Sequence, residues 1–193
     1  GWTLLGNIFG KGKQEMLPLY EAKMIHHYDH RWATYERDGT VRDVTPHEKQ
    51  DPNFDVLPRY WVERRDVEAK LEGRWDREWL LGCRSTDERT CIATLFPRAA
   101  VSNKLPLILG GLSEVDQLCL QAVLSSFPLD YAVRQKQSST SLNFFIFVQI
   151  PVPAPSQMRG TTAWTAQRQL SDWLSIRANW LNDSCEPATR AVV

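Results

Sequence analysis

The sequence predicts a mixed α+β fold, in which a mixed sheet packs against helices, and three observations lead to this class. Two apolar segments, residues 79–84 and 90–96, flank a polar tip and indicate a hairpin of two strands. The residues from Ser113 to Leu124 place apolar side chains at helical spacing behind a serine cap, which indicates a buried helix. Residues 143–150 form a nearly continuous apolar run, which predicts another strand. Strands, helices, a strand and a helix in this order are typical of an α+β domain.

The N-terminal part is predicted to be mostly extended. Residues 1–16 are interpreted as a loose lead-in segment, and residues 17–35 as extended structure rather than a long helix. Asp38-Gly39 lies between apolar flanks and predicts a hairpin turn. Residues 43–58 are polar and contain three prolines, so we expect a surface loop there.

The remaining elements follow from shorter patterns. Residues 60–62 and 105–109 predict short strands, and residues 66–71 predict a brief helix. Residues 129–135 predict a second helix after the buried one, and residues 166–182 predict a last helix with one apolar face. We therefore expect a lead-in over residues 1–16, one domain over residues 17–182 and a tail over residues 183–193.

Composition and charge exclude several classes of protein. A chain of 193 residues with 42% hydrophobic and 24% charged residues is typical of one folded domain rather than a disordered protein. Lysine plus arginine and aspartate plus glutamate both number 23, which excludes a strongly basic nucleic-acid binder but leaves a local basic face open. No apolar run is long enough to span a membrane, and we expect no membrane partner.

Two further features concern the location and origin of the chain. The four cysteines show no Cys-x-x-Cys spacing, and one lies in the predicted buried helix, so we expect reduced thiols in a cytoplasmic protein. The chain starts with Gly1-Trp2 rather than methionine, which leads us to expect a piece of a longer protein.

Three patterns that suggest catalysis are incomplete. His26 and His30 would share a helix face as two metal ligands do, but the glutamate that activates water in such sites is missing. Glu68 to Lys70 reads Glu-Ala-Lys, as in magnesium-dependent nucleases, although many helices contain the same residues. Asp51 to Phe54 approaches the Asp-Pro-Pro-aromatic loop of amino-methyltransferases without its second proline. We therefore expect this chain to be non-catalytic and to hold neither a metal nor a cofactor.

One series of motifs is specific enough to indicate a protein family. Residues 120–126 read LQAVLSS, residues 129–136 read LDYAVRQK, and residues 142–153 read LNFFIFVQIPVP. Upstream, residues 19–35 read LYEAKMIHHYDHRWATY, residues 58–62 read PRYWV, and residues 84–94 read RSTDERTCIAT. In this order the motifs resemble the target recognition domain (TaqI-like specificity domain) of type II restriction–modification adenine-N6 DNA methyltransferases. The resemblance covers about residues 17 to 180.

This resemblance implies a function and partners. It implies a target-recognition-domain-like fold that reads a specific sequence of double-stranded DNA and positions adenine for a separate N6-methyltransferase domain. That catalytic domain would precede these residues in the same parent chain and would hold the S-adenosylmethionine cofactor. The parent would be a restriction–modification or phage-defence enzyme, with or without endonuclease activity, in the cytoplasm of a bacterium or archaeon.

The candidate DNA-binding residues combine side chains that suit phosphates and base edges. Arginine binds guanine bidentately, asparagine binds adenine, and carboxylates accept from cytosine, whereas lysine and histidine suit phosphate. The polar tip between the two predicted strands offers several of these types in one loop. The candidates are Arg84, Ser85, Thr86, Asp87, Arg89, Asn103, Lys104, Arg134 and Lys136, with Lys23, His27, His30 and Arg31 as a second segment. Two alternatives stay open: a protein-docking domain of a defence complex that does not read DNA, and a metal-dependent nuclease.

Overall fold

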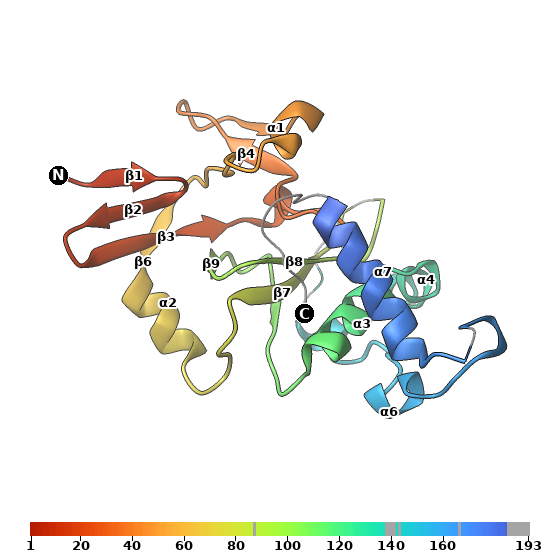
Figure 1. The fold of residues 1–193 in the computed structure, drawn as a ribbon. Coiled ribbons are helices and arrows are strands. Elements are labelled where there is room, and N and C mark those ends of the chain that lie inside the picture. Colours follow the sequence, from red (N-terminus) through yellow and green to blue (C-terminus); the bar gives the residue numbers. More distant parts are fainter. Residues whose placement is uncertain (87, 138–141, 143, 166, 185–193) are drawn as a thin grey trace.

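A computed structural model describes residues 1–86, 88–137, 142, 144–165 and 167–184, and it confirms the α+β class with a mixed sheet and packed helices. Figure 1 shows the strands of the N-terminal half projecting on one side, with the longer helices of the C-terminal half on the other. The β7–β8 hairpin lies between these two parts.

The N-terminal sheet contains five strands. Its members are β1 (Thr3–Leu5), β2 (Ile8–Lys11), β3 (Gln14–Tyr20), β6 (Trp61–Glu63) and β9 (Ala100–Val101). The first four run antiparallel in the order β1-β2-β3-β6, and β9 pairs parallel with β3. The expectation of a loose lead-in over residues 1–16 is wrong. Gly6 and Gly12 take positive φ of 60° and 61°, which permits the two tight turns that join these strands.

The predicted central hairpin is confirmed. Strands β7 (Trp79–Arg84) and β8 (Ile92–Pro97) pair antiparallel along their whole length, and β10 (Leu107–Ile108) extends this sheet beside β7. A smaller pair, β4 (Ala33–Tyr35) and β5 (Val41–Asp43), is joined through the expected turn at Gly39, whose φ is 82°.

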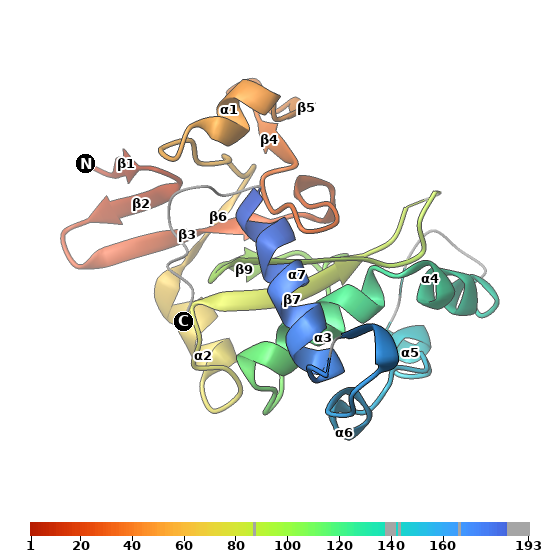
Figure 2. The same ribbon diagram turned by 45° about the vertical axis from the view of Figure 1, so that its right-hand side comes forward.

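Helices of the C-terminal half lie together on one side of the hairpin in both ribbon views (Figures 1 and 2). The described helices are α1 (Pro46–Gln50), α2 (Arg64–Leu71), α3 (Glu114–Leu124), α4 (Phe127–Arg134), α5 (Phe144–Phe147), α6 (Pro155–Met158) and α7 (Leu170–Ser184), with short 3-10 turns at η1 (Ala22–Met24) and η2 (Ala163–Thr165). Ser113 caps α3 as predicted, because its hydroxyl accepts the Asp116 backbone N–H. The amides of Gln121 and Asn182 exchange buried hydrogen bonds of 2.9 and 2.8 Å that hold α3 against α7.

Two segments differ from the sequence predictions. Residues 43–58 contain α1 rather than only a loop, because Thr45 and Glu48 form a capping box around Pro46 at the first helical position. The strand predicted at residues 143–150 is wrong, since Phe144–Phe147 forms α5. Ile146 and Phe147 both pack on the core beneath, and two consecutive inward side chains suit a helical turn rather than an alternating strand. The predicted start of the last helix at Ala166 lies outside the described residues.

The β7–β8 hairpin separates two hydrophobic clusters. Leu80 and Phe96 face the N-terminal sheet and α2, whereas Leu81 and Leu95 face α3, α4 and α5. This alternation is what the period of two along a strand requires. Buried positions on both faces fix the register of the hairpin's two strands. Cys83, Cys91 and Cys119 are free buried thiols.

Candidate nucleic-acid interface

The tip of the β7–β8 hairpin is an ordered turn. The Thr86 backbone N–H donates to the Arg89 carbonyl at 2.7 Å, and the Arg89 N–H donates to the Thr86 hydroxyl at 3.1 Å. Ser85 is half-buried beside them, and Asp87 lies outside the described residues. These two hydrogen bonds join the described residues on either side of Asp87.

A carboxylate at the start of α4 anchors this tip. Asp130 is buried and accepts hydrogen bonds from the backbone N–H and the hydroxyl of Thr90 at 2.7 and 2.8 Å. Arg89 and Arg134 each bring a guanidinium nitrogen to 3.3 Å from its oxygens. Burial opposes ionisation, but the hydrogen bonds from Thr90 and Arg134 and the charge of Arg89 outweigh it and lower the pKa of Asp130 to about 2.

The three arginines of the tip also bind backbone carbonyls. Arg89 donates to the Ser125 carbonyl at 3.1 Å and lies over the ring of Phe127. Arg134 donates to the Glu88 carbonyl at 2.7 Å, which ties α4 to the tip. Arg84 donates to the Ala22 carbonyl at 2.6 Å, which ties β7 to the segment before the histidines. Burial lowers the pKa of Arg84 without removing its charge at neutral pH.

The histidine segment forms a tight turn beside the tip of the β7–β8 hairpin. The backbones of His26 and Asp29 exchange hydrogen bonds of 2.7 and 3.1 Å, and Tyr28 between them takes a positive φ of 58°. A positive φ is uncommon for a bulky residue, and such strain clusters at functional sites. The Asp29 carboxylate holds the turn by accepting from the Arg31 backbone N–H at 2.8 Å and from Lys49 Nζ at 2.5 Å.

His27, Arg84, Arg89 and Asp130 form what we call the tip cluster. Burial lowers the pKa of His27 to about 4, and the charges of Arg89 and Arg84 add to the shift while Asp130 opposes it. His27 is therefore neutral at pH 7, with one nitrogen that donates and one that accepts. Within the described part of the chain, both of its ring nitrogens and the Nε atom of Arg84 are buried without a hydrogen-bond partner. The Arg89 Nε lies 3.3 Å from the Asp130 carboxylate as an ion pair.

The structure brings some sequence-predicted residues together and leaves others apart. Three separate segments converge at the hairpin tip and contribute Arg84, Ser85, Thr86 and Arg89, Arg134, and His27. Lys23 is exposed over the ring of Tyr35, and Lys136 is exposed at the end of α4. Asn103 and Lys104 are exposed on the loop after β9, where Asn103 lines a separate cavity.

Two candidates of the histidine segment face inward. Arg31 is only 3% exposed, and its guanidinium donates to the carbonyls of Lys49, Asp51 and Phe54 at 2.6, 3.2 and 3.2 Å. His30 is buried against the ring of Trp79. The expectation that these two side chains reach a phosphate does not fit their positions, because neither is open to a ligand.

Sequence reasoning missed Asp130, Thr90 and Tyr28. The i, i+4 spacing of Asp130 and Arg134 was a signal for an ion pair on one helix face. Nothing in the sequence marks the left-handed backbone of Tyr28, and the bond from Thr90 to Asp130 joins positions 40 residues apart.

The other catalytic patterns gain no support from the geometry. Over the described ranges, no group of three His, Cys, Asp or Glu side chains is placed to hold a metal ion. Glu68 of the Glu-Ala-Lys pattern forms an ion pair with Arg98 at 2.6 Å, so its carboxylate already has a partner. None of the helices in the described part is long and apolar enough to cross a membrane.

Comparisons with known proteins give no further constraint. No family model, curated protein or solved structure matches this chain.

The low pKa of His27 predicts a pH dependence of stability. The neutral form is favoured in the folded chain, whereas unfolded histidine titrates near its ordinary value of 6.5. The free energy of unfolding should therefore fall as the pH drops from about 6.5 towards 4, because protons bind preferentially to the unfolded chain. Urea unfolding at pH 7.5, 6 and 5 measures this decline, to which His26, whose pKa burial also lowers, contributes.

Two variants isolate the contribution of His27. His27→Gln should make the decline between pH 7.5 and 5 smaller, whereas His47→Gln on the exposed surface of α1 should leave it unchanged. An equally steep decline in His27→Gln would contradict the assignment. Asp130 acts in a separate window, because the stability due to its lowered pKa is lost only as the pH falls from about 4 through 2.

Proposed function

We propose that this chain binds double-stranded DNA as a target recognition domain, and that the tip cluster is the part that contacts base edges. The observation that carries the proposal is the presence of buried polar atoms without a described hydrogen-bond partner on two side chains of the tip cluster, His27 and Arg84. Nearly all buried polar groups in proteins have a hydrogen-bond partner. Several unpaired groups in one place therefore favour a ligand that supplies their hydrogen bonds.

The chemistry of the cluster suits nucleic acid. The Arg84 Nε–H, which has no hydrogen-bond partner among the described residues, suits an acceptor such as guanine O6 or N7 or a phosphate oxygen. Neutral His27 offers one donor and one acceptor, which matches the mixed pattern of a base edge better than a phosphate alone. Asp130 and the three carbonyl contacts hold the arginines in place, and such preorganisation reduces the entropy lost on binding.

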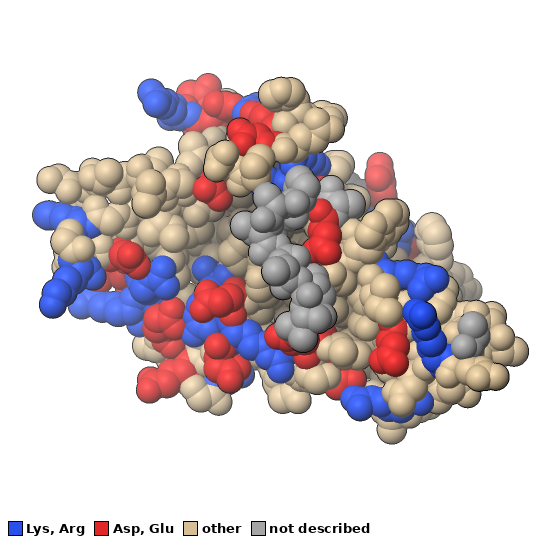
Figure 3. All heavy atoms as spheres, in the orientation of Figure 1, with Lys and Arg blue, Asp and Glu red and all other residues tan. Residues whose placement is uncertain are grey.

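The surrounding surface supports weak rather than strong binding. Lys23 and Lys136 are exposed, and no described carboxylate forms an ion pair with either of them. Elsewhere, positive and negative side chains are interspersed on the face shown in Figure 3, without a continuous basic surface. A neutral chain of this kind makes few phosphate contacts, so further affinity would come from a partner domain.

The proposed partner follows from the sequence resemblance. An adenine-N6 methyltransferase domain of the same parent chain would bind S-adenosylmethionine and act on the adenine that this domain positions. In this arrangement the described chain supplies sequence recognition and no catalytic group. Protein docking is the second candidate, favoured by exposed aromatic side chains on α4 and α7, with Phe127, Tyr131 and Trp180 at 78%, 67% and 69% exposure.

Replacing the two exposed lysines, Lys23 and Lys136, with glutamine tests DNA binding without disturbing the fold. The double variant Lys23→Gln/Lys136→Gln should weaken binding to a duplex about tenfold, because each lost phosphate contact weakens binding uniformly across sequences. Fluorescence anisotropy with a labelled duplex at low salt measures the affinity.

A matched control removes the same charge elsewhere. Lys13→Gln/Lys70→Gln, on the β2–β3 turn and on α2, should bind as the unaltered chain does. Equal affinities for both double variants would place the contact surface elsewhere. Absence of duplex binding, together with capture of a partner protein through Phe127 and Tyr131, would favour the docking alternative.

A further inference from the structure

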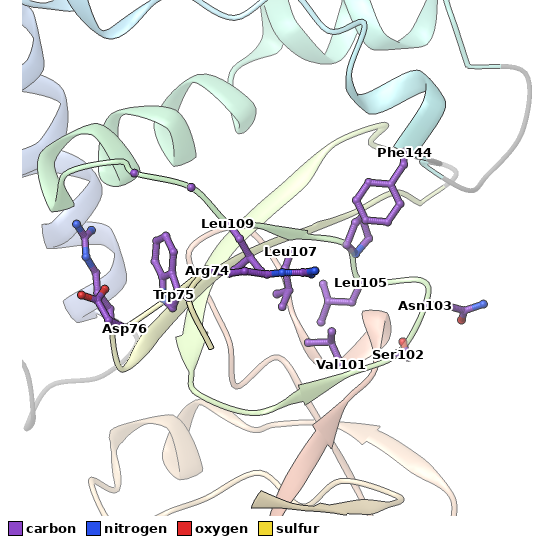
Figure 4. Close-up of a pocket in the computed structure, with 15 residues that line it drawn as sticks. Arg74, Trp75, Asp76, Val101, Ser102, Asn103, Leu105, Leu107, Leu109 and Phe144 are labelled. Atoms are coloured by element: carbon purple, nitrogen blue, oxygen red, sulfur yellow. The ribbon is translucent and has the colours of Figure 1, made fainter. Parts of the chain in front are cut away.

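A large cavity lies apart from the tip cluster. It measures about 1290 Å³ and is formed by the loop between α2 and β7, by the chain on either side of β10, and by the first residue of α5. Leu105, Leu107 and Leu109 supply apolar walls. Figure 4 shows Trp75 and Phe144 on different sides of this space, with their rings directed towards it.

An arginine without a described partner points into this space. Arg74 is exposed, and its guanidinium extends into the cavity while the Asp76 carboxylate points to the edge beyond Trp75 (Figure 4). Among the residues described by the structure, no carboxylate or carbonyl contacts the Arg74 side chain. An exposed guanidinium beside apolar walls suits a ligand that has both an anionic and an apolar part.

A second arginine gives independent support. Arg77 lies over the ring of Trp75 and donates through Nη2 to the Leu112 carbonyl at 2.5 Å. Its Nη1 is buried and has no hydrogen-bond partner in the described part of the chain. Arg77 therefore has an unused donor within the residues that line the cavity.

We propose that this cavity binds a nucleotide, with the base stacked on the exposed ring of Phe144 and the phosphate on Arg74. Bases stack on aromatic side chains regardless of sequence, and arginine suits phosphate because its donors form a planar fork. The volume exceeds the roughly 300–1000 Å³ of a usual small-molecule pocket, which leaves room for adjoining backbone. This site shares no residue with the tip cluster, so it does not depend on duplex binding there.

Calorimetric titration of the full chain with dAMP and dTMP tests the site. Both should bind with saturation, and Arg74→Gln and Phe144→Ala should each weaken binding by about tenfold or more. Arg74 is exposed and Phe144 is 62% exposed, so both variants should fold. Arg37→Gln, an exposed arginine in the β4–β5 turn, should leave the affinity unchanged.

Two comparisons identify the part of the ligand that is recognised. Deoxyadenosine and inorganic phosphate should each bind more weakly than dAMP. Equal binding of phosphate and dAMP would overturn the proposal, because a simple anion site would explain it. Absence of saturable binding of either nucleotide at millimolar concentration, or equal binding by Arg74→Gln, would overturn it as well.

The source of the nucleotide is settled by duplex probes. If the occupant is an unpaired nucleotide of a DNA strand, a duplex with one bulged nucleotide should bind more tightly than a perfectly paired one, and Arg74→Gln should remove the difference. If the occupant is a free nucleotide, both duplexes should bind equally while dAMP still binds. Failure of duplex binding with dAMP binding intact would count against the proposed function and leave this site standing.

Discussion

Replacing Asp130 with alanine should lower the free energy of unfolding by about 3–5 kcal/mol, because it leaves buried partners without their carboxylate. The variant removes the acceptor of the Thr90 backbone N–H and hydroxyl and the counter-charge of Arg89. Chemical denaturation at pH 7 measures the loss. The hairpin tip should also loosen, so duplex affinity should fall in the same variant.

A matched control and a double-mutant cycle sharpen this prediction. Asp66 occupies the first turn of α2 as Asp130 occupies that of α4, but its side chain is 64% exposed, and Asp66→Ala should cost less than about 1 kcal/mol. Thr90→Val combined with Asp130→Ala should cost less than the sum of the two single changes, since they share one network. Strict additivity, or equal effects at Asp66 and Asp130, would contradict the anchoring role.

Replacing Arg31 with alanine should lower the free energy of unfolding by about 3 kcal/mol or more. Its guanidinium satisfies three carbonyls between residues 49 and 54, and hydrogen bonds to a charged group are worth about 1.5–3 kcal/mol each. Arg31→Lys should cost less because one carbonyl can still be reached, and Arg37→Ala in the exposed β4–β5 turn should cost little.

The DNA affinity of the folded Arg31→Ala protein separates structure from contact. Measured at a temperature where the variant remains folded, duplex binding should equal that of the unaltered chain, because the Arg31 side chain is buried. A stable Arg31→Ala protein that has lost DNA affinity would instead restore Arg31 as a phosphate contact.

The sequence predicts the elements that local chemistry determines. These are the β7–β8 hairpin, the Ser113 cap and the turn at Gly39. Strands β1 and β2 are not predicted by the sequence, since the side chains of β1 are exposed, those of β2 are at most half-buried, and neither strand shows an apolar alternation. The apolar run that becomes α5 is ambiguous by itself, and only its packing against the second core cluster decides for a helix.

The candidate site was predictable only in part. The polar tip and the histidine segment are each visible as local motifs. Their convergence is a long-range contact, seen in the bond from Arg84 to the Ala22 carbonyl across 62 residues, and no local pattern encodes it. The inward direction of Arg31 has the same cause, because three carbonyls about 20 residues away draw the guanidinium into the interior.

The salt dependence of duplex binding tests the proposed function most directly. Anisotropy titrations of the full chain with a labelled duplex at several salt concentrations give the slope of log affinity against log salt. We expect weak binding with a slope of about −2 to −4, because a few phosphate contacts each contribute close to −0.9. Absence of binding at low salt, or an affinity that does not change with salt, would contradict DNA recognition by this chain.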